Sequence, residues 1–146
     1  MDNNSKVKTM SIEVIEHQGT RYAEILWANT SVEKTHFFSP AESSMQFGLL
    51  AHGAGFVEPP HVHADIERRI FGLQQMFVVQ RGVVAVDFFD AEGGKIGEVI
   101  LKKGDAILLV DGAHSLRVLE DMQCVSVKQG PFLGAAMDKI EIGVKK

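Results

Sequence analysis

The feature that most constrains the fold is a series of short apolar runs between Gln74 and Pro131, each ended by glycine, aspartate or proline. Runs of this length that are rich in Val, Ile and Phe favour β-strands, and the residues between them favour turns. Strands repeated at intervals of about 8 to 12 residues are typical of a β-sandwich or β-barrel. We therefore expect an all-β fold without a long amphipathic helix. A closed barrel or two-sheet jelly roll would also protect the edges of so many strands.

The first part of the chain predicts an amino-terminal β-hairpin. Apolar residues alternate from Ser11 onward, Gln18-Gly19-Thr20 reads as a turn, and a second extended run covers 22–27. Further short strands are expected at 34–38 and 45–52. Residues 1–10 are polar and predict a disordered tail, so we expect one domain over 11–146, with the core barrel at about 45–131.

The stretch Pro59-Pro60-His61-Val62-His63 is the most informative for function. Side chains alternate faces along an extended chain, so His61 and His63 point the same way and can converge on one ion or ligand. Both prolines suit the entry of a strand or the edge of a sheet. Neutral imidazole is a common ligand of zinc, iron, nickel and copper, but two nitrogens leave a metal site incomplete.

Composition excludes several classes of protein. The chain has 146 residues, a formal net charge of −4 and no cluster of Lys and Arg, which argues against nucleic acid as a partner. No apolar stretch is long enough for a membrane span, and the first residues do not form a secretory signal. The single cysteine, Cys124, allows no intramolecular disulfide. We expect a cytoplasmic protein that does not bind membranes.

Two spaced motifs resemble the signature motifs of the cupin superfamily of small β-barrels. They are Gly55-x5-His61-x-His63 with Gln75-x6-Gly82, and Gly104-x7-Gly112-Ala113-His114. The resemblance spans roughly residues 48–131, and segments such as 87–90 and 127–131 resemble small single-domain cupins associated with bacterial surface-polysaccharide biosynthesis. It implies an antiparallel double-sheet jelly-roll β-barrel. It does not choose among enzymes and binding proteins, because one fold supports many functions.

The resemblance also implies a divalent metal, such as zinc, nickel, iron or manganese, held by His61, His63 and His114. An acidic residue normally completes this set. Glu67 has the usual spacing after His63, but the spacing back from Gly82 selects Gln75. We favour Gln75, because alternation places it with Phe77 on one face of a strand, and the extra residues before it form a loop.

A glutamine at the acidic position weakens the case for metal. Its neutral carbonyl oxygen neutralises a divalent cation less well than a carboxylate does. The histidines, with His61 and His63 as the candidate catalytic pair, could instead act as general acid and base without metal. Sugar-nucleotide isomerases of the cupin class resemble this chain in having a His-x-His pair followed by glutamine.

Three readings of the function therefore stay open. The chain could be a metal-binding cupin that binds a carbohydrate or carboxylate, and, if it is an enzyme, converts it as a sugar-modifying isomerase or epimerase or as an oxygenase. It could be a metal-independent isomerase, or a non-catalytic binding or sensing module. Glu67 and Arg69, near the expected mouth of the barrel, and Phe77 within it are candidate ligand contacts, although Phe77 also suits the core. We expect a homodimer, with pairing through the amino-terminal hairpin.

Overall fold

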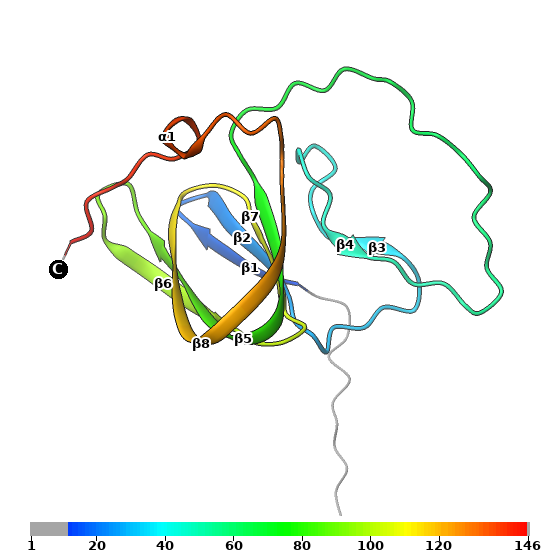
Figure 1. The fold of residues 1–146 in the computed structure, drawn as a ribbon, viewed down its shortest axis with the longest axis horizontal. Helices are drawn as coiled ribbons and strands as arrows, with labels where there is room; N and C mark the ends of the chain where they lie inside the picture. Colours follow the sequence, from blue (N-terminus) through cyan, green and yellow to red (C-terminus); the bar gives the residue numbers. More distant parts are fainter. Residues whose placement is uncertain (1–11, 146) are drawn as a thin grey trace, which may run out of the picture.

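The computed structural model describes residues 12–145 and shows an all-β fold, as the sequence predicts (Figure 1). The expected tail over 1–10 lies outside the described residues. One single-turn helix, α1, is the exception to the β structure, and no helix in the described part is long and apolar enough to cross a membrane. The elements are β1 (Glu13–His17), β2 (Thr20–Leu26), β3 (His36–Phe37), β4 (Gly48–Leu49), β5 (Gln75–Phe89), β6 (Lys95–Leu101), β7 (Ala106–Leu109), β8 (Ala113–Lys128) and α1 (Ala135–Asp138).

Six of the strands form one curled antiparallel sheet organised around the long strand β5. Along one edge of β5, β7 pairs with its first residues and β6 with its last. Along the other edge, β8 pairs with β5 over nearly its whole length. The hairpin β1–β2 extends the sheet beyond β7, so the order is β1-β2-β7-β5-β6 with β8 beside β5. The expected amino-terminal hairpin is confirmed, and its turn has positive φ at Gln18 and Gly19.

The apolar runs 75–80 and 83–89 predict two strands separated at Arg81-Gly82, but the structure has a bulge there rather than a turn. Gly82 has a φ of +81°, which glycine adopts at low cost, and the register between β5 and β8 shifts on both sides of Arg81. Both strands therefore continue through the irregularity and bend there. What the sequence pattern divides into two pairs of short strands forms one long, bent pair.

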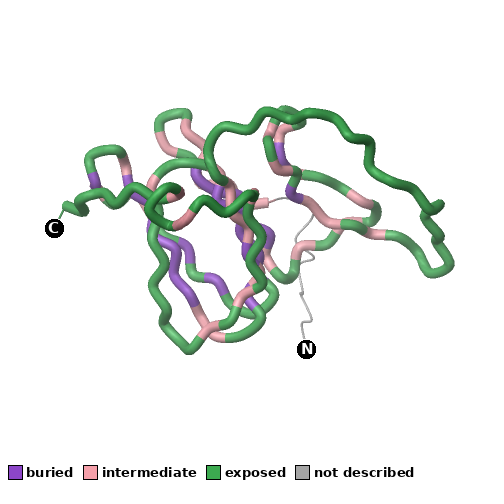
Figure 2. Tube along the Cα trace, turned by 45° about the horizontal axis from the view of Figure 1, so that its top comes forward, coloured by how far each residue is buried: buried purple, intermediate pink, exposed green. Residues whose placement is uncertain are grey.

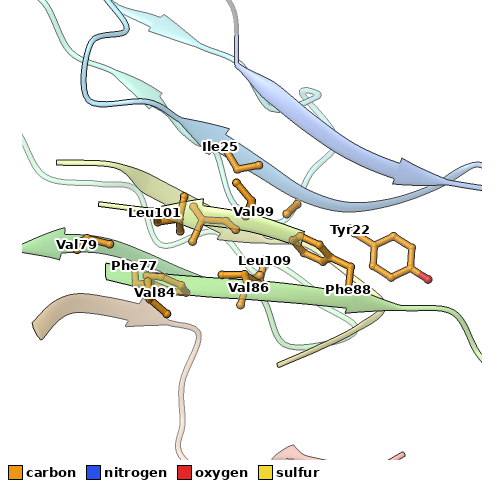
Figure 3. Packing of buried hydrophobic residues seen from close by; sticks show 12 residues of the cluster. Tyr22, Ile25, Phe77, Val79, Val84, Val86, Phe88, Val99, Leu101 and Leu109 are labelled. Atoms are coloured by element: carbon orange, nitrogen blue, oxygen red, sulfur yellow. The ribbon is translucent and has the colours of Figure 1, made fainter. Parts of the chain in front are cut away.

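Two apolar clusters cover opposite faces of this sheet. Inside the curl, side chains from β2, β5, β6 and β7 point toward one another, as Figure 3 shows for Ile25, Val86 and Leu101. Tyr22 and Phe88 add an edge-to-face aromatic pair at 6.2 Å. The second cluster lies on the other face, where Phe47 and neighbouring residues of the segment 38–49 pack on the sheet. These clusters account for the buried strands in Figure 2.

A buried carboxylate attaches the segment 38–49 to the sheet. Glu24 on β2 is 1% exposed. The Ser39 hydroxyl donates to Glu24 Oε2 at 2.6 Å and accepts from the Phe47 backbone N–H at 2.9 Å. Arg21 Nε lies 3.2 Å from Glu24 Oε1. Because buried charges need partners, these contacts fix where the segment crosses the sheet.

The curl is not closed in the described structure. The second sheet consists of only the two-residue strands β3 and β4, shorter than the expected strands at 34–38 and 45–52. Residues 50–74 extend away from the main sheet as a long loop (Figure 1). The strand expected at His61 and His63 does not form there, because that segment has no neighbouring strand to pair with in 12–145. The closed jelly roll and the single domain over 11–146 therefore stay predictions.

Candidate functional site

The two histidines of the His-x-His motif lie side by side in the extended segment. The ring centroids of His61 and His63 are 5.4 Å apart, and the rings are nearly perpendicular. His61 Nδ1 lies 3.0 Å from the Pro59 carbonyl oxygen, an acceptor that favours the tautomer protonated at Nδ1. That tautomer leaves Nε2 with a free lone pair. The pair is exposed to solvent, so both rings are open to a ligand.

His114 lies at the start of β8, on the inner face of the curl. It stands opposite Phe88 of β5, and residues directly opposite in an antiparallel pair share a face. Neighbouring atoms that displace water lower the pKa of His114, Lys139 lowers it further, and the Gly112 carbonyl at 3.4 Å opposes both effects. His114 is therefore mainly neutral at pH 7, the form required of a metal ligand or a general base.

A cavity of about 390 Å³ opens beside His114. This volume lies within the usual range for small-molecule sites. The cavity is bounded by the last residues of the long loop and by the turn between β7 and β8, and its lining residues are Phe71, Gly72, Leu73, Gln74, Leu109, Val110, Asp111, Gly112 and His114. The sequence predicts the mouth of the barrel near Glu67 to Arg69 instead. The Asp111-Gly112 turn before His114 is the sequence signal that could have indicated the cavity.

Gln75 lies at the first position of β5, next to this cavity in sequence. Its Nε2 donates to Ser126 Oγ of β8 at 2.8 Å, which makes the carbonyl Oε1 the atom that could ligate a cation. The neighbouring Gln74 has a buried Oε1 with no hydrogen-bond partner. An unpaired buried acceptor costs about 1 to 3 kcal/mol. The residue that connects the long loop to β5 therefore lacks a hydrogen bond in this arrangement.

The other candidate contacts have different surroundings. Glu67 and Arg69 form an exposed ion pair with a 3.0 Å contact in the long loop. Phe77 is 3% exposed and belongs to the core cluster inside the curl. Its role as a ligand contact stays a prediction, and its packing alone accounts for its burial. Cys124 is partly buried, and burial raises the pKa of its thiol, which disfavours the reactive thiolate.

The structure pairs His61 with His63 but does not join His114 to them. Among residues 12–145, no three side chains of His, Cys, Asp or Glu lie close enough together to hold a metal ion. The ligand set His61, His63, His114 and Gln75 is thus a prediction that requires the long loop to approach β8.

Comparisons with known protein families, with curated proteins and with solved structures give no match for this chain.

Proposed function

We propose that this chain is a cupin-type protein in which His61, His63, His114 and Gln75 bind one divalent cation, and a carbohydrate or carboxylate binds in the adjacent cavity. The proposal rests on one observation: two adjacent imidazoles lie on a segment without strand partners, while a third lies beside an unpaired strand edge. Each of these features is unusual for a packed β-protein.

The unpaired edge belongs to β8, which pairs only with β5 among the described residues. Leu116 and Val118 stand opposite Val86 and Val84, so they share the inner face with the core, yet they are 45% and 55% exposed. A long, apolar strand with a free edge is a template for a further strand. A strand added beside the first half of β8 would close the curl next to His114.

The long loop is a suitable source for this strand. A segment such as 50–74 is longer than loops without secondary structure usually are, since most end within about 12 to 15 residues. It also contains exposed apolar side chains that a solvated loop does not need, including Val57 at 80%, Val62 at 91% and Phe71 at 97%. Burial of each large apolar side chain would contribute about 1.5 to 3 kcal/mol.

Closure costs conformational entropy, which a bound metal ion would offset in part. Ordering each residue of the loop costs roughly 1 to 2 kcal/mol of backbone entropy. A cation bound by ligands from both the loop and β8 favours the closed arrangement, by about 2.7 kcal/mol at 100 times its dissociation constant. Movement of the loop would also free the buried Gln74 oxygen to find a partner. We therefore expect closure and metal binding to be coupled.

The chemistry of the site follows from its neutral ligands. Three imidazoles and an amide oxygen place no negative charge on the cation, so binding is weaker than with a glutamate and other positions stay open. A bound divalent cation would act as a Lewis acid toward a sugar hydroxyl or carbonyl group. Glu67 and Arg69, on the same loop, would approach the ligand when the loop closes.

A metal-independent isomerase is the second candidate, favoured by the neutral His114 beside the cavity. In this reading, His114 accepts a proton from a sugar carbon next to a carbonyl group, and His61 or His63 donates a proton of its own to the enediolate that forms. A non-catalytic binding module would use the same cavity without turnover. Detection of a converted sugar by mass spectrometry separates the enzymes from the module.

A homodimer remains part of the proposal. β1 pairs only with β2 within residues 12–145, so its outer edge is open to a second copy of the chain. Pairing of two β1 edges would extend both sheets and would leave β8 free for the loop. Sedimentation of the whole protein distinguishes a dimer from a monomer.

The decisive experiment measures metal content in four proteins: wild type, His61→Ala, His114→Ala and the control His17→Ala. We expect near-stoichiometric zinc, nickel, iron or manganese in wild type and in His17→Ala, and loss of metal in the other two. Hydrogen exchange should show that metal protects amides at 57–63 and 113–119 together. Stoichiometric metal in His61→Ala, or metal without new protection, would contradict the proposal. Absence of metal in all four would favour the second candidate.

A further inference from the structure

A second hollow, of about 490 Å³, lies where β2 ends and where the chain turns from β6 into β7. Its lining joins one aromatic side chain, two lysines and several polar groups, namely Glu13, Trp27, Ala28, Asn29, Lys102, Lys103 and Asp105. It is a shallow hollow, broadly open to solvent, rather than an enclosed cavity. Because β7 runs from Ala106 to Leu109, this hollow and the cavity beside His114 lie at opposite ends of that strand.

Trp27 gives the hollow a fixed aromatic wall. One side of the indole packs against the core cluster, and its Nε1–H donates to Glu13 Oε2 at 3.1 Å. These contacts already hold the ring in one orientation, so binding of a ligand costs little conformational entropy of this side chain. An aromatic face of this kind can pack on the apolar C–H face of a sugar ring. Trp27 is also the only tryptophan in the chain.

A buried carboxylate holds the two sides of the hollow together. Asp105 is 8% exposed and accepts the Ala28 N–H at one oxygen and the Lys102 N–H at the other, each at 2.8 Å. Its oxygens are therefore used by the backbone and do not serve as an acid in the hollow. The brace keeps Trp27 and Lys102 at a fixed spacing.

The two lysines in the lining of the hollow are uncommitted, whereas its two carboxylates, Glu13 and Asp105, already accept hydrogen bonds. Lys102 and Lys103 are exposed, and no ion pair among the described residues includes either of them. Glu13 already accepts the indole N–H. Two uncommitted ammonium groups beside an aromatic wall, in a chain of formal net charge −4, favour a ligand that combines a ring with a dianion.

We propose that this hollow binds a monosaccharide phosphate, with the sugar ring on Trp27 and the phosphate between Lys102 and Lys103. The Asn29 side chain would contact the sugar hydroxyls. The site is separate from the histidine site and does not depend on metal. It would let the protein hold a phosphorylated sugar at one end of the sheet while the cavity at the other end binds its own ligand.

The test uses Trp27 fluorescence, because the only tryptophan reports on this hollow alone. Metal-free wild-type protein is titrated with glucose 6-phosphate, with glucose and with inorganic phosphate. We expect saturable quenching by glucose 6-phosphate with a dissociation constant of about 1 mM or tighter, and weaker effects from the other two. The double variant Lys102→Ala/Lys103→Ala should bind at least about tenfold more weakly. Lys145→Ala is the matched control, because its backbone contacts the turn at the opposite end of β6.

Amide chemical shifts provide the second measurement. Glucose 6-phosphate should shift the signals of Ala28, Asn29 and Lys102 in wild type, and the double variant should keep its fold and lose these shifts. The proposal is overturned if glucose 6-phosphate gives no saturable quenching up to about 10 mM. It is also overturned if Lys102→Ala/Lys103→Ala binds glucose 6-phosphate as tightly as the control Lys145→Ala does. Shifts confined to Gly112 and His114 would also overturn it, since they would place the sugar phosphate at the other end of the sheet.

Discussion

Two of the strands that pair with β5, β7 and β8, differ sharply. β7 pairs with β2 on one side and with β5 on the other, and all four of its residues are buried. β8 pairs with β5 alone, and most of its sixteen residues are exposed. β7 has only apolar residues, whereas β8 mixes apolar with polar and charged ones, yet inner-face residues of β8 such as Leu116 and Val118 are also exposed. The difference teaches that a strand becomes fully buried only when it has a paired strand on each side. β8 has one free edge, and this edge is where the curled sheet stays open.

The first prediction compares a core residue of β7 with an apolar residue of β8. Ile107→Ala should lower the free energy of unfolding by about 2 to 5 kcal/mol, because the removed side chain is completely buried. Leu116→Ala should lower it by less than about 1 kcal/mol, because that side chain is 45% exposed. Urea unfolding followed by circular dichroism measures both.

If Ile107→Ala and Leu116→Ala lowered the free energy of unfolding equally, the proposed difference in burial between β7 and β8 would be wrong. A loss for Leu116→Ala that grows only when zinc is added would sharpen the comparison, because the long loop would then cover β8 in the metal-bound protein.

The second prediction concerns the bulge between β5 and β8. A Cβ on Gly82 would meet the Asp121 backbone carbonyl, and the φ of +81° is unfavourable for alanine. Gly82→Ala should cost about 1 to 3 kcal/mol. Gly97→Ala on β6 is the control, since its Cβ would meet nothing within 4 Å, and it should be neutral or slightly stabilising. A neutral Gly82→Ala would show that β8 moves away from β5 easily.

The third prediction addresses the ion pairs that connect β8 to the rest of the sheet. Asp87 on β5 is buried and bonds Arg117 of β8, with a 3.0 Å contact to Nη2, and Lys95 of β6 at 2.8 Å. The Arg117 hydrogen bonds are the main cause that holds the pKa of Asp87 well below its usual range, with Lys95 adding to the effect against the desolvation of the carboxylate. Asp87→Asn should cost about 1 to 2 kcal/mol at pH 7, because the partner cations are half exposed.

The pH dependence of this pair has a definite sign. Because the pKa of Asp87 is lower in the folded protein, its contribution is present above its unfolded pKa of about 3.9 and is lost as the pH falls below that value. The unfolding free energy of Asp87→Asn should therefore fall less steeply with acid than that of wild type. Glu98→Gln is the control, since the exposed Glu98 contacts the same two cations. If the unfolding free energy of Asp87→Asn fell with acid as steeply as that of wild type, Asp87 would not be the group responsible for the loss.

The smallest expected effect concerns His114. Because desolvation and Lys139 lower its pKa in the folded protein, the unfolded chain binds the proton more readily, and stability should decline as the pH falls through about 6.5. The decline should be small, because the ring is partly exposed to solvent. His114→Gln should remove it, as melting temperatures at pH 7.5 and 5.5 would show. An equal decline in the variant would assign the effect to other groups.

Local patterns predicted several strands well. The run 22–27 matches β2, and the turn at Gln18-Gly19 connects it to β1 in the expected hairpin. In these places apolar periodicity and turn residues agree, and the pairing partners lie close in the sequence. The prediction of a strand end at Gly82 was wrong, because a glycine with positive φ occurs in a bulge as well as in a turn. Only pairing with β8 determines that a bulge forms here.

The candidate site was predictable only in part. The spacing of His61 and His63 predicted that their rings lie together, and they do. The cavity beside His114 was missed, because it is formed by residues 71–74 and 109–114, which the chain brings together only through pairing of β5 with β7. The hollow beside Trp27 was missed for the same reason.

The sequence alone therefore determined the all-β class, the amino-terminal hairpin and the side-by-side histidines, because each depends on alternation and turn preferences within a few residues. The tertiary structure decided which strands are buried, where the cavities lie and how far His114 stands from the other histidines. These depend on contacts between distant parts of the chain, whose free energies come from burial and strand pairing that no local pattern contains.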